Sequence, residues 1–223
     1  MSPDSEPASV RAWAIVPAAG FSTRMGTNKL FLPWGETTVL GRLLATLQDA
    51  PLDGVFVVGR AEDVELRSAV TALTRIPAER SVPVEFIAAH PPPPDMRTSV
   101  EWGLGRVERE QPQPRDVWLV VPADHPLADA STIVALLDAW RRQPCDILIP
   151  TFHARRGHPT LFAWSLAAAC RALPRDVGLN RLVKDSSRRL IEWPVDDPSI
   201  RLDLDTPADY QRERPSPPPV GNR

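Results

Sequence analysis

The sequence predicts an α/β fold in which a mainly parallel sheet lies between two layers of helices. Short apolar runs that are rich in Val and Ile and bounded by Gly or Pro are typical of strands covered on both faces. Five such runs occur, at 12–16, 55–58, 82–88, 117–121 and 147–149. Amphipathic stretches separate them, at 37–48, 62–73, 99–107 and 131–140. Strand and helix therefore alternate four times, which predicts parallel strands with helices on both faces.

The predicted helices each present an apolar face. The clearest is 37–48, whose apolar residues recur at helical spacing: Val39, Leu40, Leu43, Leu44 and Leu47. After Pro150 the pattern loosens, and we expect a short strand followed by a helix over 161–170, a short helix over 178–184 and a strand over 190–195. The four consecutive prolines at 91–94 exclude a helix or a central strand there.

Length and composition favour one domain with loose ends. The chain has 223 residues, of which 43% are hydrophobic, enough for a sizeable core. We expect the domain to span 12–212. A polar arm at 1–11 and a proline-rich tail at 213–223 lack an apolar pattern, so both are predicted to be disordered.

Charge and hydropathy argue against two classes of partner. With 26 basic and 28 acidic residues the net charge is −2, less basic than a protein that grips nucleic acid over a broad surface. No apolar run approaches the ~18 residues that cross a bilayer, and the N-terminal stretch lacks the apolar region of a secretory signal. The two cysteines form no C-x-x-C pair. We therefore expect a cytoplasmic protein with no nucleic-acid or membrane partner.

The loop after the first predicted strand is the first candidate site, because ligands in open α/β sheets bind beyond the carboxyl ends of the strands. Small residues at 18–20 let a base or phosphate approach the backbone, and Gly20 also permits positive φ. Ser22 offers a hydroxyl, while Arg24 and Lys29 offer positive charges. Backbone N–H groups, a guanidinium fork and a point charge are what a triphosphate requires.

Three other loop motifs fail by spacing. A P-loop needs four residues between its glycines, whereas five separate Gly20 from Gly26. The dinucleotide fingerprint G-x-G-x-x-G is absent, and Arg24 stands where a nucleophile elbow needs its last glycine. An ordinary loop with surface charges remains the alternative. Against it, Lys29 is one of only two lysines in a chain with 24 arginines.

Polar residues near the ends of later strands are further candidates. Asp124 follows an apolar run, where a carboxylate can hold Mg²⁺; the alternative role, capping the next helix, suits Asp129 or Ser131 better. Asp205 precedes Thr206-Pro207 and can either face a metal or cap a helix. His158, in a tight turn before an apolar run, can contact an acceptor substrate or simply pack beneath a loop.

Four segments carry a resemblance to a known family. Residues 18–33, Ala-Ala-Gly-x-Ser-x-Arg-Met-Gly-x-x-Lys-x-x-x-Pro, resemble the signature loop of the molybdenum cofactor cytidylyltransferase type within the MobA-like NTP transferases. The Pro-Ala-Asp-His-Pro segment at 122–126, the Gly-His-Pro segment at 157–159 and the Asp-x-Asp-Thr-Pro-x-Asp-Tyr segment at 203–210 are similar to later motifs of that family. Residues 95–104 are closer to the isoprenoid-pathway cytidylyltransferases, shortened by one residue.

The resemblance implies a fold and a set of site residues. The fold would be the Rossmann-like, three-layer fold of nucleotide-diphospho-sugar transferases. Arg24, Lys29 and Asp124 would be catalytic, and Mg²⁺ would bind Asp124 and a second carboxylate, Asp203 or Asp205, with Asp205 favoured. His158 would contact the acceptor. Residues expected to bind nucleotide are Ala18, Ala19, Gly20, Ser22, Arg24, Lys29 and Ser99.

The implied reaction is transfer of a nucleoside monophosphate to a phosphorylated acceptor with release of pyrophosphate. The resemblance makes CTP the donor and molybdopterin, the organic part of the molybdenum cofactor, the acceptor, with a molybdoenzyme as a further partner. Two alternatives stay open. One is nucleotidyl transfer from GTP, or to a sugar phosphate or an isoprenoid-pathway alcohol phosphate. The other is a non-catalytic chaperone that binds nucleotide and hands on a finished cofactor.

Overall fold

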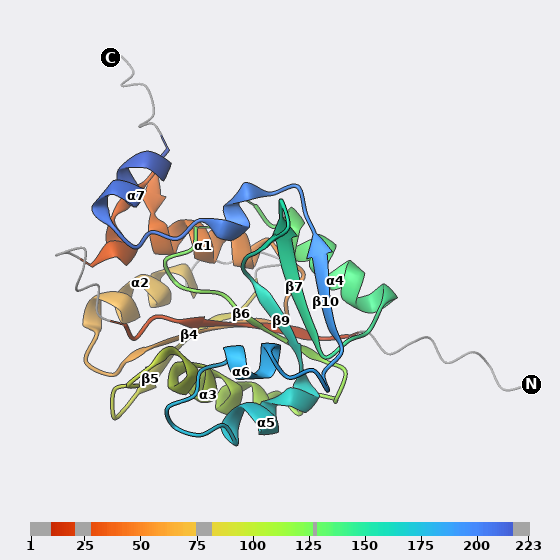
Figure 1. The fold of residues 1–223 in the computed structure, drawn as a ribbon. Coiled ribbons are helices and arrows are strands. Elements are labelled where there is room, and N and C mark those ends of the chain that lie inside the picture. Colours follow the sequence, from red (N-terminus) through yellow and green to blue (C-terminus); the bar gives the residue numbers. More distant parts are fainter. Residues whose placement is uncertain (1–9, 21–27, 75–81, 127–128, 216–223) are drawn as a thin grey trace, which may run out of the picture.

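The computed structural model describes residues 10–20, 28–74, 82–126 and 129–215, and within them the chain forms a twisted sheet between two helical layers (Figure 1). The main sheet has eight strands in the order β10-β7-β9-β6-β1-β4-β5, with β8 paired to β7. Its strands are β1 (Ala12–Pro17), β4 (Gly54–Arg60), β5 (Val84–Ala89), β6 (Val117–Val120), β7 (Ile147–Phe152), β8 (Arg155–Arg156), β9 (Thr160–Ala163) and β10 (Leu190–Pro194). A separate two-stranded sheet pairs β2 (Pro33–Trp34) with β3 (Thr37–Thr38).

The helices lie on both faces of the main sheet. They are α1 (Val39–Gln48), α2 (Val64–Thr74), α3 (Met96–Val107), α4 (Ser131–Arg142), α5 (Ala167–Arg171), α6 (Asn180–Val183) and α7 (Pro207–Glu213). In Figure 1, α1, α2 and α4 lie on one side of the sheet and α3, α5 and α6 on the other. The predicted α/β class with a three-layer, mainly parallel sheet is confirmed.

Alternation along β1 divides the core into two halves. Ala12, Ala14 and Val16 face the cluster that contains α1, α2 and α4, whereas Trp13 and Ile15 face α3 and α5. All five side chains are at most 2% exposed, so β1 is the centre of the molecule. A central strand buried on both faces appears in the sequence as a continuous apolar run.

The prediction of a helix over 161–170 is wrong in its first half. Thr160–Ala163 form β9, which runs antiparallel between β6 and β7, and the helix α5 begins only at Ala167. Leu161 and Phe162 are buried on opposite faces of the sheet. A short apolar run that is buried on both faces has no amphipathic period, so periodicity does not separate it from a buried helix.

Helix α3 begins three residues earlier than the sequence predicts. The Asp95 side chain caps it by accepting a hydrogen bond of 2.7 Å from the Thr98 N–H. The other helices and strands that the sequence predicts agree with the structure to within a few residues, whereas the two-residue strands β2, β3 and β8 were not predicted. Among the described residues, no helix is both long and apolar enough to cross a membrane.

A small separate apolar cluster attaches the C-terminal segment to the rest of the domain. It contains Trp34, Val39, Leu204 and Tyr210. The Tyr210 hydroxyl donates a hydrogen bond of 2.6 Å to the carbonyl of Pro33. Helix α7 begins with a capping box between Thr206 and Asp209, which fixes the direction in which residues 202–206 approach it.

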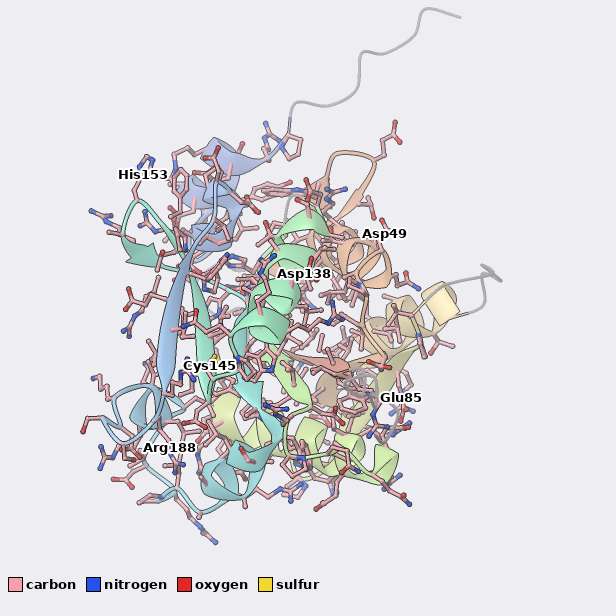
Figure 2. All side chains as sticks on the ribbon, turned by 90° about the vertical axis from the view of Figure 1, so that its right-hand side faces the viewer. Asp49, Glu85, Asp138, Cys145, His153 and Arg188 are labelled. Atoms are coloured by element: carbon pink, nitrogen blue, oxygen red, sulfur yellow. The ribbon has the colours of Figure 1, made fainter. Side chains whose placement is uncertain are left out.

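Both cysteines are buried free thiols. Burial raises the pKa of Cys145, labelled in Figure 2, to about 11 and that of Cys170 to about 12. Both thiols therefore stay protonated at neutral pH, and neither is a candidate nucleophile or metal ligand.

Candidate active site

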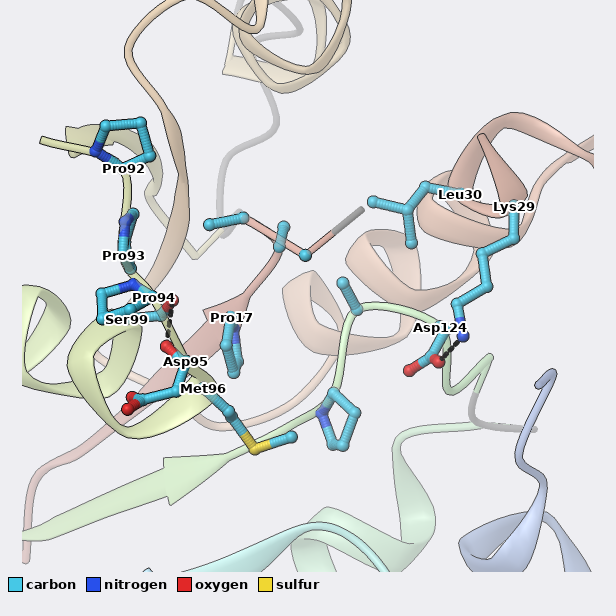
Figure 3. Close-up of a pocket in the computed structure, with 15 residues that line it drawn as sticks. Pro17, Lys29, Leu30, Pro92, Pro93, Pro94, Asp95, Met96, Ser99 and Asp124 are labelled. Carbon is cyan, nitrogen blue, oxygen red and sulfur yellow. Dashed lines mark hydrogen bonds and ion pairs between the residues drawn. The ribbon is translucent and has the colours of Figure 1, made fainter. Parts of the chain in front are cut away.

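A cavity of about 510 Å³ lies beyond the carboxyl ends of β1 and β6 and at the N-terminus of α3 (Figure 3). This is where an open α/β sheet binds its ligand. The lining residues come from four separate stretches of the chain: Pro17, Ala18, Ala19, Gly20, Lys29, Leu30, Pro92, Pro93, Pro94, Asp95, Met96, Ser99, Pro122, Ala123 and Asp124. Of the predicted site residues, the cavity brings together Ala18, Ala19, Gly20, Lys29, Ser99 and Asp124.

The backbone after β1 is hydrogen-bonded to β4 on one side and lines the cavity on the other. The Ala18 N–H donates a hydrogen bond of 2.8 Å to the carbonyl of Val58, and Arg60 Nη1 donates one of 3.1 Å to the carbonyl of Ala19. A Cβ added to Gly20 would have no heavy atom within 4 Å, and the Gly20 φ is not in the left-handed region. Neither internal packing nor backbone strain therefore requires glycine here. Glycine leaves room for a ligand to approach the backbone.

The opposite wall of the cavity is apolar apart from Asp95 and Ser99 at the start of α3. Pro92, Pro93 and Pro94 precede that helix, and Met96 in its first turn is 51% exposed. Ser99 lines the cavity but is only 2% exposed, and its hydroxyl donates a hydrogen bond of 3.3 Å to the carbonyl of Asp95 (Figure 3). The Ser99 hydroxyl is thus engaged by its own helix.

Oxygen atoms from two distant segments converge on the ammonium of Lys29. Its Nζ forms an ion pair with Asp124, lies 3.4 Å from Asp205 Oδ1, and donates a hydrogen bond of 3.2 Å to the carbonyl of Leu204. The Lys29 and Asp124 side chains are 17% and 22% exposed. We call Lys29, Asp124 and Asp205 the charged cluster.

The C-terminal segment reaches Lys29 because its residues alternate. Leu204 is fully buried in the small apolar cluster. Asp203 and Asp205 on either side of it are exposed, and both turn toward the site: Asp205 contacts Lys29, and Asp203 approaches His125. Asp205 does not cap α7, because Thr206 does so. The capping alternative for Asp124 is also wrong, because Asp129 accepts the hydrogen bond from the Ser131 N–H.

The charged cluster fits a hard divalent cation. Two carboxylates and one carbonyl face the Lys29 ammonium, so they already surround one cation, and oxygen is the ligand that Mg²⁺ prefers. Among the described residues, no group of three or more His, Cys, Asp or Glu side chains could hold a metal ion. A metal here would therefore complete its coordination with water and phosphate oxygens, as Mg²⁺ usually does at phosphate sites.

Two histidines lie beside the charged cluster. His125 is 1% exposed, its Nδ1 lies 3.7 Å from Asp203 Oδ1, and its ring meets the ring of His158 edge to face at 5.5 Å. Burial, together with the neighbouring His125, lowers the pKa of His158 to about 4, so this imidazole is neutral at pH 7. The adjacent His125 also holds the pKa of Asp203 below its usual range.

Two predicted residues lie outside the described part of the chain, Ser22 and Arg24. Conversely, the sequence reasoning assigned no role to Arg60, His125 or the carbonyl of Leu204. For His125 a signal was present, because it precedes proline in the same way as His158 does. For the other two groups the loop motif carries no signal, because their partners are distant in the sequence.

The fold and the cavity define an α/β domain with a polar site at the carboxyl edge of its sheet, where a loop of small residues, a lysine and carboxylates meet. The chain belongs to the MobA-like NTP transferase domain family, whose sequence model matches residues 14–190. Similarity at the level of the sequence does not extend to curated proteins, none of which matches the chain significantly.

Solved structures share this fold over almost their whole length. Rv0371c from Mycobacterium tuberculosis H37Rv is 26% identical, with a TM-score of 0.69 over 91% of this chain and 97% of that one. A complex of the same protein with manganese is 24% identical, with a TM-score of 0.63 over 91% and 97%. A nucleotidyl transferase from Methanothermobacter thermautotroptrophicus is 20% identical, with a TM-score of 0.71 over 92% and 96%.

Proposed function

We propose that the chain transfers CMP from CTP to the phosphate of molybdopterin and releases pyrophosphate. One observation carries the proposal: the charged cluster lies at the edge of a cavity that is otherwise lined by small residues at the end of β1 and by apolar side chains. Such a cavity suits a ligand with a flat base at one end and several negative charges at the other. The choice of CTP and molybdopterin rests on the resemblance of residues 18–33 to cytidylyltransferases.

The apolar wall would bind the base, and the backbone of residues 18–20 would bind the sugar and phosphates. The prolines at 92–94 and Met96 offer a surface on which a base can lie. Ala18, Ala19 and Gly20 present backbone to the same space without side chains in the way. Ser99 would act indirectly, since its hydroxyl stabilises the first turn of α3 beneath the base.

Lys29, with Arg24 from the same loop, would neutralise the triphosphate and the departing pyrophosphate. The acceptor phosphate is already ionised at pH 7, so the reaction needs no side chain as a covalent nucleophile. Catalysis then depends on holding two anionic groups in line and on lowering their repulsion. These are tasks for fixed positive charges close to the transferred phosphorus.

Asp124 and Asp205 would hold Mg²⁺, which supplies positive charge between donor and acceptor phosphates. The manganese complex of Rv0371c is in keeping with a divalent ion in this fold. Asp203 would act on the acceptor side through His125 rather than as a metal ligand, because its carboxylate turns toward that imidazole.

His158 would contact the acceptor as a neutral imidazole. With its pKa lowered to about 4 it adds no positive charge, so it suits hydrogen bonding to an uncharged part of the acceptor better than phosphate binding. The product would pass to a molybdoenzyme, and the buried reduced thiols suit a cytoplasmic reaction.

Pyrophosphate release measured with each of the four NTPs, with and without molybdopterin, tests the proposal. We expect release with CTP and molybdopterin together. Release with GTP, or with a sugar phosphate or an alcohol phosphate as acceptor, would keep the reaction type and change the substrates. Nucleotide binding without release under any combination would favour the chaperone alternative.

A further inference from the structure

The Lys29 ammonium is enclosed by oxygens that a divalent cation would also choose. Its partners are the carboxylates of Asp124 and Asp205 and the carbonyl of Leu204. These three groups come from two segments about 80 residues apart in the sequence, and the Leu204 side chain is fully buried, which fixes its carbonyl. The arrangement is therefore built by the tertiary fold and not by one flexible loop.

Electrostatics make an ammonium and a metal ion exclude one another at this point. Two carboxylates bring two negative charges, and Lys29 neutralises one of them. A divalent cation bound to the same Asp124 oxygen would lie within a few ångströms of the ammonium, where the two positive charges repel each other strongly.

We propose that Lys29 occupies the cation position of the site in the ligand-free protein and that divalent metal displaces it. The displaced ammonium needs a new anion, and the cavity that Lys29 lines is the one in which we place the triphosphate. Metal and nucleotide then bind with positive coupling. The metal displaces Lys29 and frees it to pair with the nucleotide, and the nucleotide pairs with Lys29 and frees the carboxylates for the metal. The inference rests on the proposed metal site, and its tests below are independent of catalysis.

Mn²⁺ binding to the nucleotide-free protein, followed by electron paramagnetic resonance, tests the exchange. We expect Lys29→Met to bind Mn²⁺ at least about tenfold more tightly than the wild type, because a unit positive charge next to the site is gone. The gain should disappear in the double variant Lys29→Met/Asp124→Asn. The chain offers a matched control, since Lys184→Met removes the only other lysine, which is exposed beyond α6.

A measurement without substitution keeps the inference testable if Lys29→Met does not fold. Lysine labelled with ¹³C at Cε gives two side-chain signals, from Lys29 and Lys184. Adding Mg²⁺ should shift the Lys29 signal and leave that of Lys184 in place. In both experiments the ligand is the metal ion alone.

Several outcomes would overturn the inference. They are equal Mn²⁺ affinity in the wild type and Lys29→Met, no Mn²⁺ binding in Lys29→Met, or a Lys29 signal that Mg²⁺ at saturation leaves unchanged. Each would mean that Lys29 is a permanent structural partner of Asp124. Pyrophosphate release judges the proposed function separately, so the failure of one is distinguishable from the failure of the other.

Discussion

The two sides of the cavity are built differently. The recognition wall, residues 17–20 and 92–99, consists of small residues after β1, prolines and the start of α3, and each part is made by a short local stretch. The charged cluster of Lys29, Asp124 and Asp205 is assembled from residues up to 176 positions apart and closes through ion pairs. One side offers a surface to a ligand, while on the other side charged groups already pair with one another within the protein.

This difference separates binding from chemistry. Changes in the recognition wall should alter how tightly, and which, nucleotides bind. Changes in the charged cluster should alter turnover, because the proposed reaction redistributes charge there. The two sides are therefore expected to respond to substitution in different kinetic constants.

Asp124→Asn should give the largest effect, because it keeps the shape of the side chain and removes the charge that holds a hard cation. We expect kcat to fall by about 10²–10³-fold, the loss typical of one preorganised electrostatic group. Nucleotide affinity, measured by calorimetry on the same protein, should change far less. Asp138→Asn is the control, since Asp138 is an exposed carboxylate on α4 (Figure 2) that, like Asp124, forms an ion pair, in its case with Arg141.

If Asp124→Asn and Asp138→Asn released pyrophosphate at the same rate, the charged cluster would have no part in turnover. A loss of nucleotide affinity as large as the loss of kcat would instead mean that the charged cluster also binds the nucleotide. Either result would contradict the assignment of binding to one side of the cavity and chemistry to the other.

The pH dependence of stability tests the region where His158 lies beside the charged cluster. Its pKa is about 4 in the folded protein and about 6.5 when unfolded, so the unfolded chain binds the extra proton first. Stability contributed by the neutral form is present above pH 6.5 and falls as pH drops from 6.5 toward 4. We expect the wild type to lose about 2–3 kcal/mol more over this range than His158→Asn, measured by urea unfolding.

His153→Asn is the matched control for this pH series. His153 is an exposed histidine in the turn between β7 and β8 (Figure 2). Its φ of 50° is one that asparagine adopts readily, so the substitution causes no backbone strain. A wild type and a His158→Asn variant with parallel pH curves would contradict the neutral, buried state of His158.

Both sides of the cavity were predictable only in part, since the sequence predicted residues 18–20 and Ser99 of the recognition wall but not the prolines at 92–94 or Met96. Ala18, Ala19 and Gly20 follow a strand that its apolar run reveals, and local signals suffice for such a site. Asp124 was predictable for the same reason. That Asp203 and Asp205 both turn toward the site depends on the burial of Leu204 between them, and the packing of the C-terminal segment against Trp34 determines this.

The same physical limit explains the wrong helix over 161–170. Whether an apolar run becomes a strand depends on partners that pair with both of its edges, and here these are β6 and β7, which lie earlier in the sequence. Local periodicity carries no information about that pairing. Long-range assembly is thus what the sequence reasoning lacks, in the fold and in the site alike.

Arg60→Met tests whether the backbone of the recognition wall is held in place from behind. Arg60 donates a hydrogen bond to the carbonyl of Ala19 and pairs with Asp63 at 3.3 Å. Losing a charge-assisted hydrogen bond should weaken nucleotide binding about tenfold while kcat changes little. Isothermal calorimetry with CTP and steady-state pyrophosphate release measure the two effects.

Arg67→Met is the control for Arg60. Arg67 is exposed on α2 and also donates a hydrogen bond to a backbone carbonyl, that of Ala61, outside the cavity. Its loss should leave nucleotide affinity unchanged. If Arg60→Met behaved like Arg67→Met, the loop at 18–20 would be positioned without help from the Arg60 side chain.

Met96→Ala should have the smallest effect and sharpen the comparison most. Met96 is 51% exposed in the cavity wall, so its truncation costs little packing and should leave the melting temperature within about 1–2 °C of the wild type. If a base lies on this side chain, KM for the nucleotide should rise about threefold, the loss of part of one apolar contact, with kcat unchanged. Val134→Ala, on the exposed face of α4, is the control for losing an exposed apolar side chain. A rise in KM that differs among the four NTPs would show that the recognition wall reads the base, whereas a fall in kcat without a change in KM would move Met96 to the side of the cavity that performs the chemistry.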